Sequence, residues 1–386
     1  MQCWQEIQCM MRKAQRIADI QQQCIVKNGE DMDMIFSDRY QNYIRRYAYM
    51  LNAGIAIKEG VFLISGATGL IGSVLVDCLM QMNEEHKTGF KVIALSRNPE
   101  TAKERFCRYW EQNDFQHVVC DVNCAIPEVG DVDYVIHAAS NTHPLAYSQD
   151  PIGTIKTNVI GTDFLLQYTR THNGKRFVFL SSVEIYGECG EGQESFREQD
   201  LGYIDCNQLR AGYPESKRVG ESLCCAYQSQ FGMDIVIPRL CRVYGPTMRQ
   251  DDSKALAQFM KKAIAKENIV LKSDGQQYYS YIHVLDAVSA IMLVLDKGKK
   301  GEAYNVSSQK SNVKLCELAD KLAKLAGTQV IFEMPDRTEQ QGYSKATRAI
   351  LDSTKIEHLG WHAELDIDSG LQMTLQIMDE AIREKQ

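Results

Sequence analysis

The residues with the most specific chemical spacing are Tyr213 and Lys217, four positions apart in the run Tyr-Pro-Glu-Ser-Lys. At the start of a predicted helix this spacing places both side chains on one face, with the ammonium group near the phenol. A phenol with its usual pKa of about 10 is a poor base, and a neighbouring cation lowers that pKa. The pair therefore predicts a proton acceptor, although a helix-surface pair without chemistry has the same spacing.

A second group of candidate residues follows a predicted strand at residues 177–180, in the run Ser-Ser-Val-Glu-Ile-Tyr-Gly. Ser182 can hydrogen-bond the same hydroxyl that Tyr213 deprotonates, and Glu184 can act at a neighbouring carbon. A serine pair after a strand also serves as a turn or a helix cap, so that alternative stays open.

A third group is formed by Gly66, Gly69 and Gly72, which follow an apolar run at residues 61–64 and precede a helical pattern. Residues without a Cβ let the backbone approach a phosphate and let a helix pack on a strand. The N-terminus of that helix directs free N–H groups and a positive dipole end at an anion. The pattern favours a phosphate-binding turn over a plain tight turn.

Strands and helices alternate around these three groups. Apolar strands are expected at residues 61–64, 91–95, 116–120, 132–138, 177–180 and 234–239, with helices at 155–170 and 214–231. This alternation predicts a doubly wound parallel sheet covered by helices on both faces, with ligands at the carboxyl ends of the strands.

The two ends of the chain have different patterns. Two helices are expected before residue 58, one carrying Ile7, Met11, Ala14, Ala18 and Ile25 and ending at Asn28, the other carrying Phe36, Tyr40, Tyr43, Ile44 and Tyr47. They form either a cover on the main domain or a dimerisation arm. After residue 246, helices at 255–265, 284–295 and 313–326 and a strand at 268–271 predict a smaller lobe.

The composition excludes several classes of protein. Of the 386 residues 44% are hydrophobic, and the net charge of -7 argues against a nucleic-acid-binding surface. The sequence lacks an apolar run of the roughly 20 residues that span a bilayer, and a signal-peptide pattern, so we expect a cytoplasmic protein. The 13 cysteines have no metal-binding spacing, which predicts reduced, mostly buried thiols and no metal.

Together, the three groups of residues resemble the extended short-chain dehydrogenase/reductase family, in particular nucleotide-sugar epimerases, dehydratases and decarboxylases. The resemblance covers about residues 60–375 and includes further signatures that begin at His137, Asn158, Arg239 and Leu359. It implies a Rossmann domain at 59–245 that binds NAD(P), and a mixed α/β substrate lobe at 246–386 that partly crosses back to the sheet. It also implies a nucleotide diphosphate sugar as substrate, a homodimer, and a role in cell-surface polysaccharide synthesis. Residues 1–58 are expected from their periodicity to form a helical extension before these domains.

The resemblance implies a set of cofactor-binding residues. They are Gly66, Thr68, Gly69, Leu70, Ile71, Gly72, Ser96, Arg97, Asp121, Val122, His137, Ala138, Ala139, Tyr213 and Lys217. Asp121 would lie near the adenine, and the turn from His137 to Ser140 would lie against the cofactor. The alternative for both segments is a structural strand end. NAD-preferring relatives usually carry an acid where Ser96 and Arg97 stand, and an arginine can accept the 2′-phosphate, so NADP is favoured over NAD. The alternative is a solvent-exposed Arg97 beside an NAD site.

Glu184 separates the reactions of the family. In the sugar 4,6-dehydratases of this family the motif resembles an Asp-Glu pair at the positions where this chain has Val183 and Glu184. Valine cannot donate a proton. Glucuronate decarboxylases resemble this chain in keeping Glu without Asp, and in the element from Arg210 to Tyr213. Simple 4-epimerases need only the serine, tyrosine and lysine. We therefore rank decarboxylation or epimerisation above 4,6-dehydration.

The predicted substrate-binding residues are Ser140, Arg210, Arg242 and Tyr279. Relatives usually have Asn at position 242 and Arg at position 279, so Arg242 would supply the cation for the diphosphate. Pairing of Arg242 with a nearby carboxylate is the alternative. The nucleotide is left open.

The predicted activity is transient oxidation of C4 of a nucleotide-activated sugar. Tyr213 takes the hydroxyl proton, Lys217 lowers its pKa and holds the nicotinamide ribose, Ser182 orients the hydroxyl, and Glu184 acts as base or orienting group at C5. Two alternatives remain: an NADPH-dependent reductase of a sugar or polyol precursor, and a non-catalytic NAD(P)-binding module.

Overall fold

A parallel sheet forms the centre of the protein. The computed structural model describes residues 37–142, 149–333 and 346–383. The main strand order is β11-β7-β5-β4-β1-β2-β3, and β6 also pairs with β7. The strand bounds are β1 Glu59–Ser65, β2 Gly89–Ser96, β3 Phe115–Val119, β4 Tyr134–His137, β5 Arg176–Phe179, β6 Ser181–Ser182, β7 Ile235–Leu240 and β11 Ala303–Val306. All six strands predicted from the sequence are present in this sheet.

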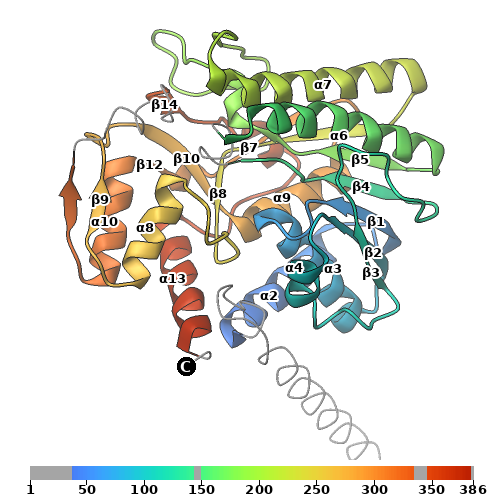
Figure 1. Ribbon diagram of the computed structural model, residues 1–386, viewed down its shortest axis with the longest axis horizontal. Helices are drawn as coiled ribbons and strands as arrows, with labels where there is room; N and C mark the ends of the chain where they lie inside the picture. Colours follow the sequence, from blue (N-terminus) through green and yellow to red (C-terminus); the bar gives the residue numbers. More distant parts are fainter. Residues whose placement is uncertain (1–36, 143–148, 334–345, 384–386) are drawn as a thin grey trace, which may run out of the picture.

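Helices cover both faces of the sheet (Figure 1). On one face α6 (Pro151–Thr171) and α7 (Gly212–Phe231) lie side by side. On the other face α3 (Leu70–His86) and α9 (Val284–Lys297) pack together. The predicted Rossmann-type, doubly wound α/β fold is therefore confirmed.

The helix α2 (Asp38–Gly54) precedes the sheet and packs on α3 and α9. It begins where the Ser37 side chain accepts a hydrogen bond from the backbone N–H of Tyr40 at 3.2 Å. Tyr40, Ile44 and Tyr47 are buried on one face, as their spacing predicts. The helix predicted from Ile7 onward lies outside the described residues.

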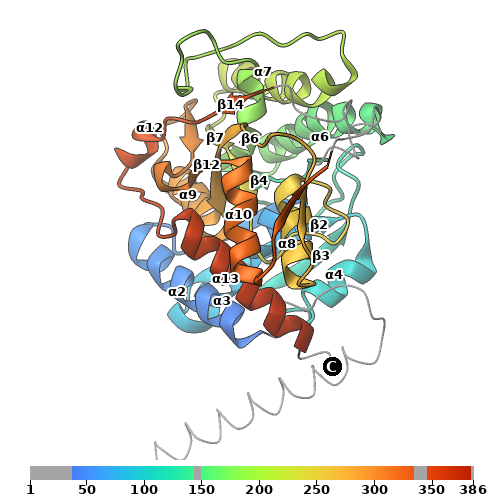
Figure 2. The same cartoon turned by 90° about the vertical axis from the view of Figure 1, so that its left-hand side faces the viewer.

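A second group of elements lies beside the main sheet in Figure 1 and faces the viewer in Figure 2. Strand β10 (Tyr278–His283) pairs with β8 (Arg242–Tyr244), β12 (Asn312–Lys314) and β14 (Arg348–Ala349). The remaining elements of this group are β9 Ile269–Leu271, β13 Val330–Phe332, α8 Ala255–Ile264, α10 Leu315–Ala326, α13 Ile367–Arg383 and the short η4 Gln309–Ser311. The short helix α12 (Thr354–Glu357) packs instead on β11 of the main sheet. A single residue, Cys241, separates β7 from β8, so the chain passes from the main sheet to the smaller sheet at this residue.

The part after residue 246 does not lie wholly in this second group. The helix predicted at 284–295 is α9, which packs against α3 and against β7 of the main sheet, so this segment returns to the sheet as the sequence analysis expected for part of the lobe. Strand β11, which the sequence did not predict, pairs with β7 in parallel. The apolar composition of α9 explains this position, because its buried residues, including Val284, Leu285, Ala287 and Val288, lie all around the helix. The exact domain boundaries stay a prediction.

Two expectations from composition concern the described residues. No helix among them is long and apolar enough to cross a membrane. The described cysteines are all free thiols. The expectation that most are buried is wrong for this part of the chain, because Cys124, Cys206 and Cys225 are exposed and three others are half-buried.

In the glycine-rich turn between β1 and α3, neighbouring backbone atoms lie so close to Gly66 and Gly72 that a side chain at either position would displace them. Gly66 has a φ of +67°, and a Cβ there would lie 2.7 Å from the backbone of Ala139. A Cβ on Gly72 would lie 2.4 Å from the carbonyl oxygen of Gly66. The start of α3 therefore packs directly on the turn.

Replacing Gly72 with alanine tests this packing. We expect Gly72→Ala to lower the free energy of unfolding by about 1–3 kcal/mol, because backbone atoms have to move to admit the methyl group. Urea denaturation measures the change. The matched control is Gly54→Ala at the end of α2, where a Cβ meets no atom within 4 Å. Equal stability of the two variants would contradict the role of Gly72.

Candidate active site

Tyr213 and Lys217 occupy the first turns of α7 and point toward the carboxyl edge of the sheet. Tyr213 is buried, and the Lys217 ammonium donates a hydrogen bond to the carbonyl oxygen of Leu180 at 2.8 Å. It also lies 4.8 Å from the centre of the Phe179 ring. Both contacts come from the end of β5, so the sheet fixes the lysine beside the predicted catalytic serine.

Ser182 performs two functions at once. Its hydroxyl oxygen accepts a hydrogen bond from the backbone N–H of Glu184 at 3.2 Å, which caps the short helix η2 (Val183–Tyr186). It also hydrogen-bonds the phenol of Tyr213, as does Ser140. The cap and the predicted contact with Tyr213 are therefore both present.

Burial determines the pKa values of the tyrosine and the lysine. It raises the pKa of Tyr213 to about 12, although hydrogen bonding to Ser182 acts in the opposite direction. Burial also lowers the pKa of Lys217 to about 8, partly offset by the charge of Glu221. A neutral phenol results, so ionisation of Tyr213 requires positive charge beyond what these residues supply.

A buried asparagine positions Tyr213. Ser140 donates a hydrogen bond to Asn158 Oδ1 at 2.7 Å, and Asn158 Nδ2 donates to Ser216 Oγ at 2.9 Å. Ser216 in turn donates to the carbonyl oxygen of Tyr213 at 2.9 Å. This chain joins the end of β4 to α6 and α7. The sequence identified Asn158 as part of a signature but did not predict its contacts, because they connect separate segments.

Glu184 is an ionised carboxylate held by two arginines. Arg210, in the short helix η3 (Leu209–Ala211), donates from Nη1 to Oε2 at 2.9 Å, and Arg242 Nη2 lies 3.8 Å from Oε1. Burial alone would raise the pKa of Glu184, but the charges of Arg210 and Arg242 lower it below the usual value. A carboxylate in this state is a weak base and cannot donate a proton, which favours the orienting function.

Arg242 lies directly on Tyr279. Its guanidinium carbon is 3.5 Å from the centre of the Tyr279 ring, and the Tyr279 hydroxyl donates to the carbonyl oxygen of Ala346 at 2.7 Å. Parallel pairing of β8 with β10 brings the two residues together. Arg242 Nη1 is buried without a hydrogen-bond partner among the described residues. Pairing with a carboxylate is thus present, and a contact with phosphate stays a prediction.

The glycine-rich turn fits a phosphate group. Gly69 precedes α3 with no side-chain cap, so the N–H groups of the first turn stay open to an anion. The predicted residues Gly66, Thr68, Gly69, Leu70 and Ile71 are half-buried, whereas Gly72 is buried. Thr247 donates to the carbonyl oxygen of Leu70 at 2.9 Å, so the segment after β8 reaches the turn.

The remaining predicted cofactor residues differ in accessibility. Arg97 and Asp121 are exposed, and Ser96 is buried with its hydroxyl 2.9 Å from His117 Nε2. Asp121 accepts a hydrogen bond from the backbone N–H of Asn123 at 2.9 Å.

Two further residues of that set are buried. Val122 packs on Gly161 of α6. His137 is fully buried and lies 2.8 Å from Ser65 Oγ, and burial lowers its pKa to about 3. Its side chain therefore serves as a neutral structural strand end, while Ala138 and Ala139 are half-buried.

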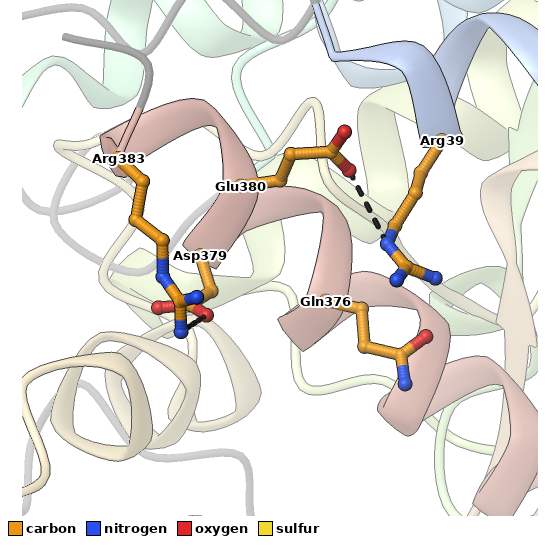
Figure 3. Close-up of a pocket in the computed structure, with 5 residues that line it drawn as sticks. All are labelled: Arg39, Gln376, Asp379, Glu380 and Arg383. Atoms are coloured by element: carbon orange, nitrogen blue, oxygen red, sulfur yellow. Dashed lines mark ion pairs between the residues drawn. The ribbon is translucent and has the colours of Figure 1, made fainter.

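A surface pocket of about 560 Å³ lies elsewhere, between α2 and α13 (Figure 3). Arg39 from α2 pairs with Glu380 at 3.3 Å, and Arg383 pairs with Asp379 within α13. These ion pairs satisfy the pocket's charges, and none of its lining residues belongs to the catalytic group. In the part of the chain that the structure describes, no group of three or more His, Cys, Asp or Glu residues could hold a metal ion.

A doubly wound sheet with a glycine-rich turn, a half-buried Ser182 and the buried pair Tyr213 and Lys217 is typical of a nucleotide-dependent oxidoreductase-type site. The chain belongs to the NAD dependent epimerase/dehydratase family, whose model matches residues 62–307. It is therefore an enzyme of an NAD-dependent epimerase/dehydratase type.

Comparison with individual proteins gives different reactions. UDP-glucuronic acid decarboxylase 5 of Arabidopsis thaliana is 30% identical over 81% of this chain and 87% of its own length. A Streptomyces venezuelae dTDP-glucose 4,6-dehydratase, solved with NAD bound, is 26% identical with a TM-score of 0.71, covering 83% of this chain and 97% of its own. A Bacillus cereus UDP-glucuronic acid 4-epimerase is 21% identical with a TM-score of 0.69, over 83% of this chain and 99% of its own, and supports the fold alone.

Two substitutions should move the pKa of Tyr213 in opposite directions. The charge of Glu184 raises that pKa and the charge of Arg210 lowers it. We therefore expect Glu184→Gln to lower the pKa of Tyr213, and Arg210→Gln to raise it. Absorbance titration of each variant against the same variant carrying Tyr213→Phe isolates this phenol. Shifts in the same direction would show that the two charges do not act on it as the geometry indicates.

Proposed function

We propose that this enzyme oxidises C4 of a nucleotide-linked sugar transiently and that the outcome is decarboxylation or epimerisation. The observation that carries the proposal is the ionised Glu184 between Arg210 and Arg242, next to Val183. Because neither residue at these positions can donate a proton, 4,6-dehydration would need an acid from another segment.

Each residue of the site has a defined function in this proposal. Tyr213 accepts the proton of the C4 hydroxyl, which Ser182 orients. Lys217 holds the nicotinamide ribose and contributes positive charge near the phenol. Bound NAD(P) supplies a hydride acceptor that returns the hydride before product leaves. Glu184 orients the substituent at C5.

Decarboxylation fits this set of residues best. Oxidation at C4 converts a sugar with a carboxylate on C5 into a β-keto acid, which loses carbon dioxide to form an enolate without an acid that protonates a leaving group. The enolate then takes a proton from water at C5, and the hydride returns to the C4 ketone. The 30% identity to an Arabidopsis UDP-glucuronic acid decarboxylase supports the same outcome. Epimerisation remains the second candidate, because the serine, tyrosine and lysine alone suffice for it.

Product analysis tests the reaction. Pure protein with bound cofactor is incubated with UDP-, CDP-, GDP- and dTDP-sugars, and the products are read by mass spectrometry and NMR. We expect loss of carbon dioxide from a nucleotide-linked uronate, and no cofactor reduction in Tyr213→Phe. Loss of water would establish dehydration, and undiminished turnover by Tyr213→Phe would overturn the assignment.

The preferred cofactor is a finer proposal. We infer NADP rather than NAD because Arg97 is exposed at the end of β2, where it can reach a 2′-phosphate. Arg97→Ala should weaken NADP binding by about tenfold and leave NAD binding unchanged. Calorimetry measures both affinities, with Lys103→Ala, another exposed cation nearby on α4 (Pro99–Arg105), as control. Equal binding of NADP before and after the substitution would contradict the inference.

The alternatives are less well supported. A reductase of a sugar or polyol precursor would consume NADPH, so net NADPH oxidation without recycling would identify it. A non-catalytic module does not require the hydrogen bonds among Ser182, Tyr213 and Ser140, which are all present.

A homodimer through α6 and α7 is our proposal for the assembly. Large apolar side chains are exposed on and next to these helices: Ile152, Ile155, Ile160, Leu209 and Val219. Such a surface favours burial against a second copy. A cytoplasmic location and a role in polysaccharide synthesis stay predictions from the sequence.

A further inference from the structure

Lys254 was not predicted from the sequence, and it joins the two parts of the molecule beside the active site. It directly precedes α8, which belongs to the second group of elements. Its ammonium group lies 3.3 Å from the hydroxyl of Thr142, which follows β4 of the main sheet. It also lies 3.7 Å from Oδ2 of Asp252. The lysine therefore connects the second group of elements to the segment that follows β4 of the main sheet.

Among the described residues, the charges around Lys254 do not balance. Arg210, Arg242 and Lys254 supply three positive charges, and Glu184 and Asp252 supply two negative ones. Burial lowers the pKa of Lys254, and the charge of Arg242 acts in the same direction, while Asp252 and Glu184 oppose it. This five-residue cluster thus carries one surplus positive charge in a partly buried place, which favours an anionic ligand group.

Two donors of the cluster remain open to such a ligand. The contacts of Lys254 with Thr142 and Asp252 are longer than most N–H···O hydrogen bonds, so the ammonium group can turn to a better acceptor at little cost. Arg242 Nη1 is buried and has no hydrogen-bond partner among the described residues. A carboxylate can accept from both donors through its two oxygens.

The position of the cluster selects the kind of anion. Glu184 stands two residues after Ser182, which hydrogen-bonds Tyr213, so the cluster lies beside the carbon that is oxidised. In a nucleotide sugar the diphosphate is attached at C1, across the ring from C4, whereas the C5 substituent is the neighbour of C4. We propose that Lys254 and Arg242 bind the C5 carboxylate of a nucleotide-linked uronic acid, which replaces the contact between Arg242 and the diphosphate expected from the sequence. This inference rests on the proposed oxidation at C4.

Binding measurements test the proposal without turnover. Each variant is prepared in a Tyr213→Phe background with cofactor bound, and calorimetry gives its affinity for UDP-glucuronate and for UDP-glucose. The two ligands share the nucleotide and differ in the C5 substituent. We expect Lys254→Gln to weaken UDP-glucuronate binding by about tenfold or more, and to leave UDP-glucose within about twofold. Lys254→Arg should retain the preference for UDP-glucuronate.

A matched control uses the same helix. Lys262→Gln removes a positive charge from α8 at an exposed ion pair with Glu267, and it should change neither affinity. Equal losses for both ligands in Lys254→Gln would place the lysine at the nucleotide and overturn the proposal, as would no loss. Failure of the proposed function is a separate result. In that case the binding preference still depends on Lys254, but the wild-type enzyme converts no nucleotide sugar at C4.

Discussion

The pairing of Glu184 with Arg210 and Arg242 is the constraint on which the site depends. A buried carboxylate is costly unless cations compensate it, so three segments have to meet at one point. Glu184 comes from η2 after the main sheet, Arg210 from η3 before α7, and Arg242 from β8 of the smaller sheet. The change of sheet at Cys241 makes this meeting possible, because β8 pairs with β10 immediately after β7 ends.

The same burial determines what the catalytic residues can do alone. It raises the pKa of Tyr213 to about 12 and lowers that of Lys217 to about 8. The phenolate and the ammonium ion are therefore both disfavoured by burial. Positive charge from an oxidised nicotinamide would favour the phenolate. The site is therefore suited to act as a base mainly when its cofactor is present, which fits a cofactor that stays bound through the reaction.

The helix α2 packs on the part of the fold that carries Tyr279, one of the predicted substrate-binding residues. Tyr47 donates a hydrogen bond to Asp286 at 2.7 Å, and the same carboxylate accepts from the backbone N–H of Leu365 at 3.0 Å. Asp286 lies in the first turn of α9, directly after β10, which carries Tyr279. Because these contacts are buried, α2 is part of the core and not a detachable arm, at least within the described residues.

The sequence by itself determined the features that depend on local spacing. The glycine-rich turn, the six predicted strands of the parallel sheet, and the placing of Tyr213 and Lys217 on one helix face follow from periodicity and residue type. Only the tertiary structure decided which charges surround Glu184. Arg242, Lys254 and Asn158 act through contacts between segments far apart in the chain, and such contacts leave no local pattern in the sequence. Strand β11 and the packing of α9 were decided in the same way, by burial against a sheet built from earlier residues.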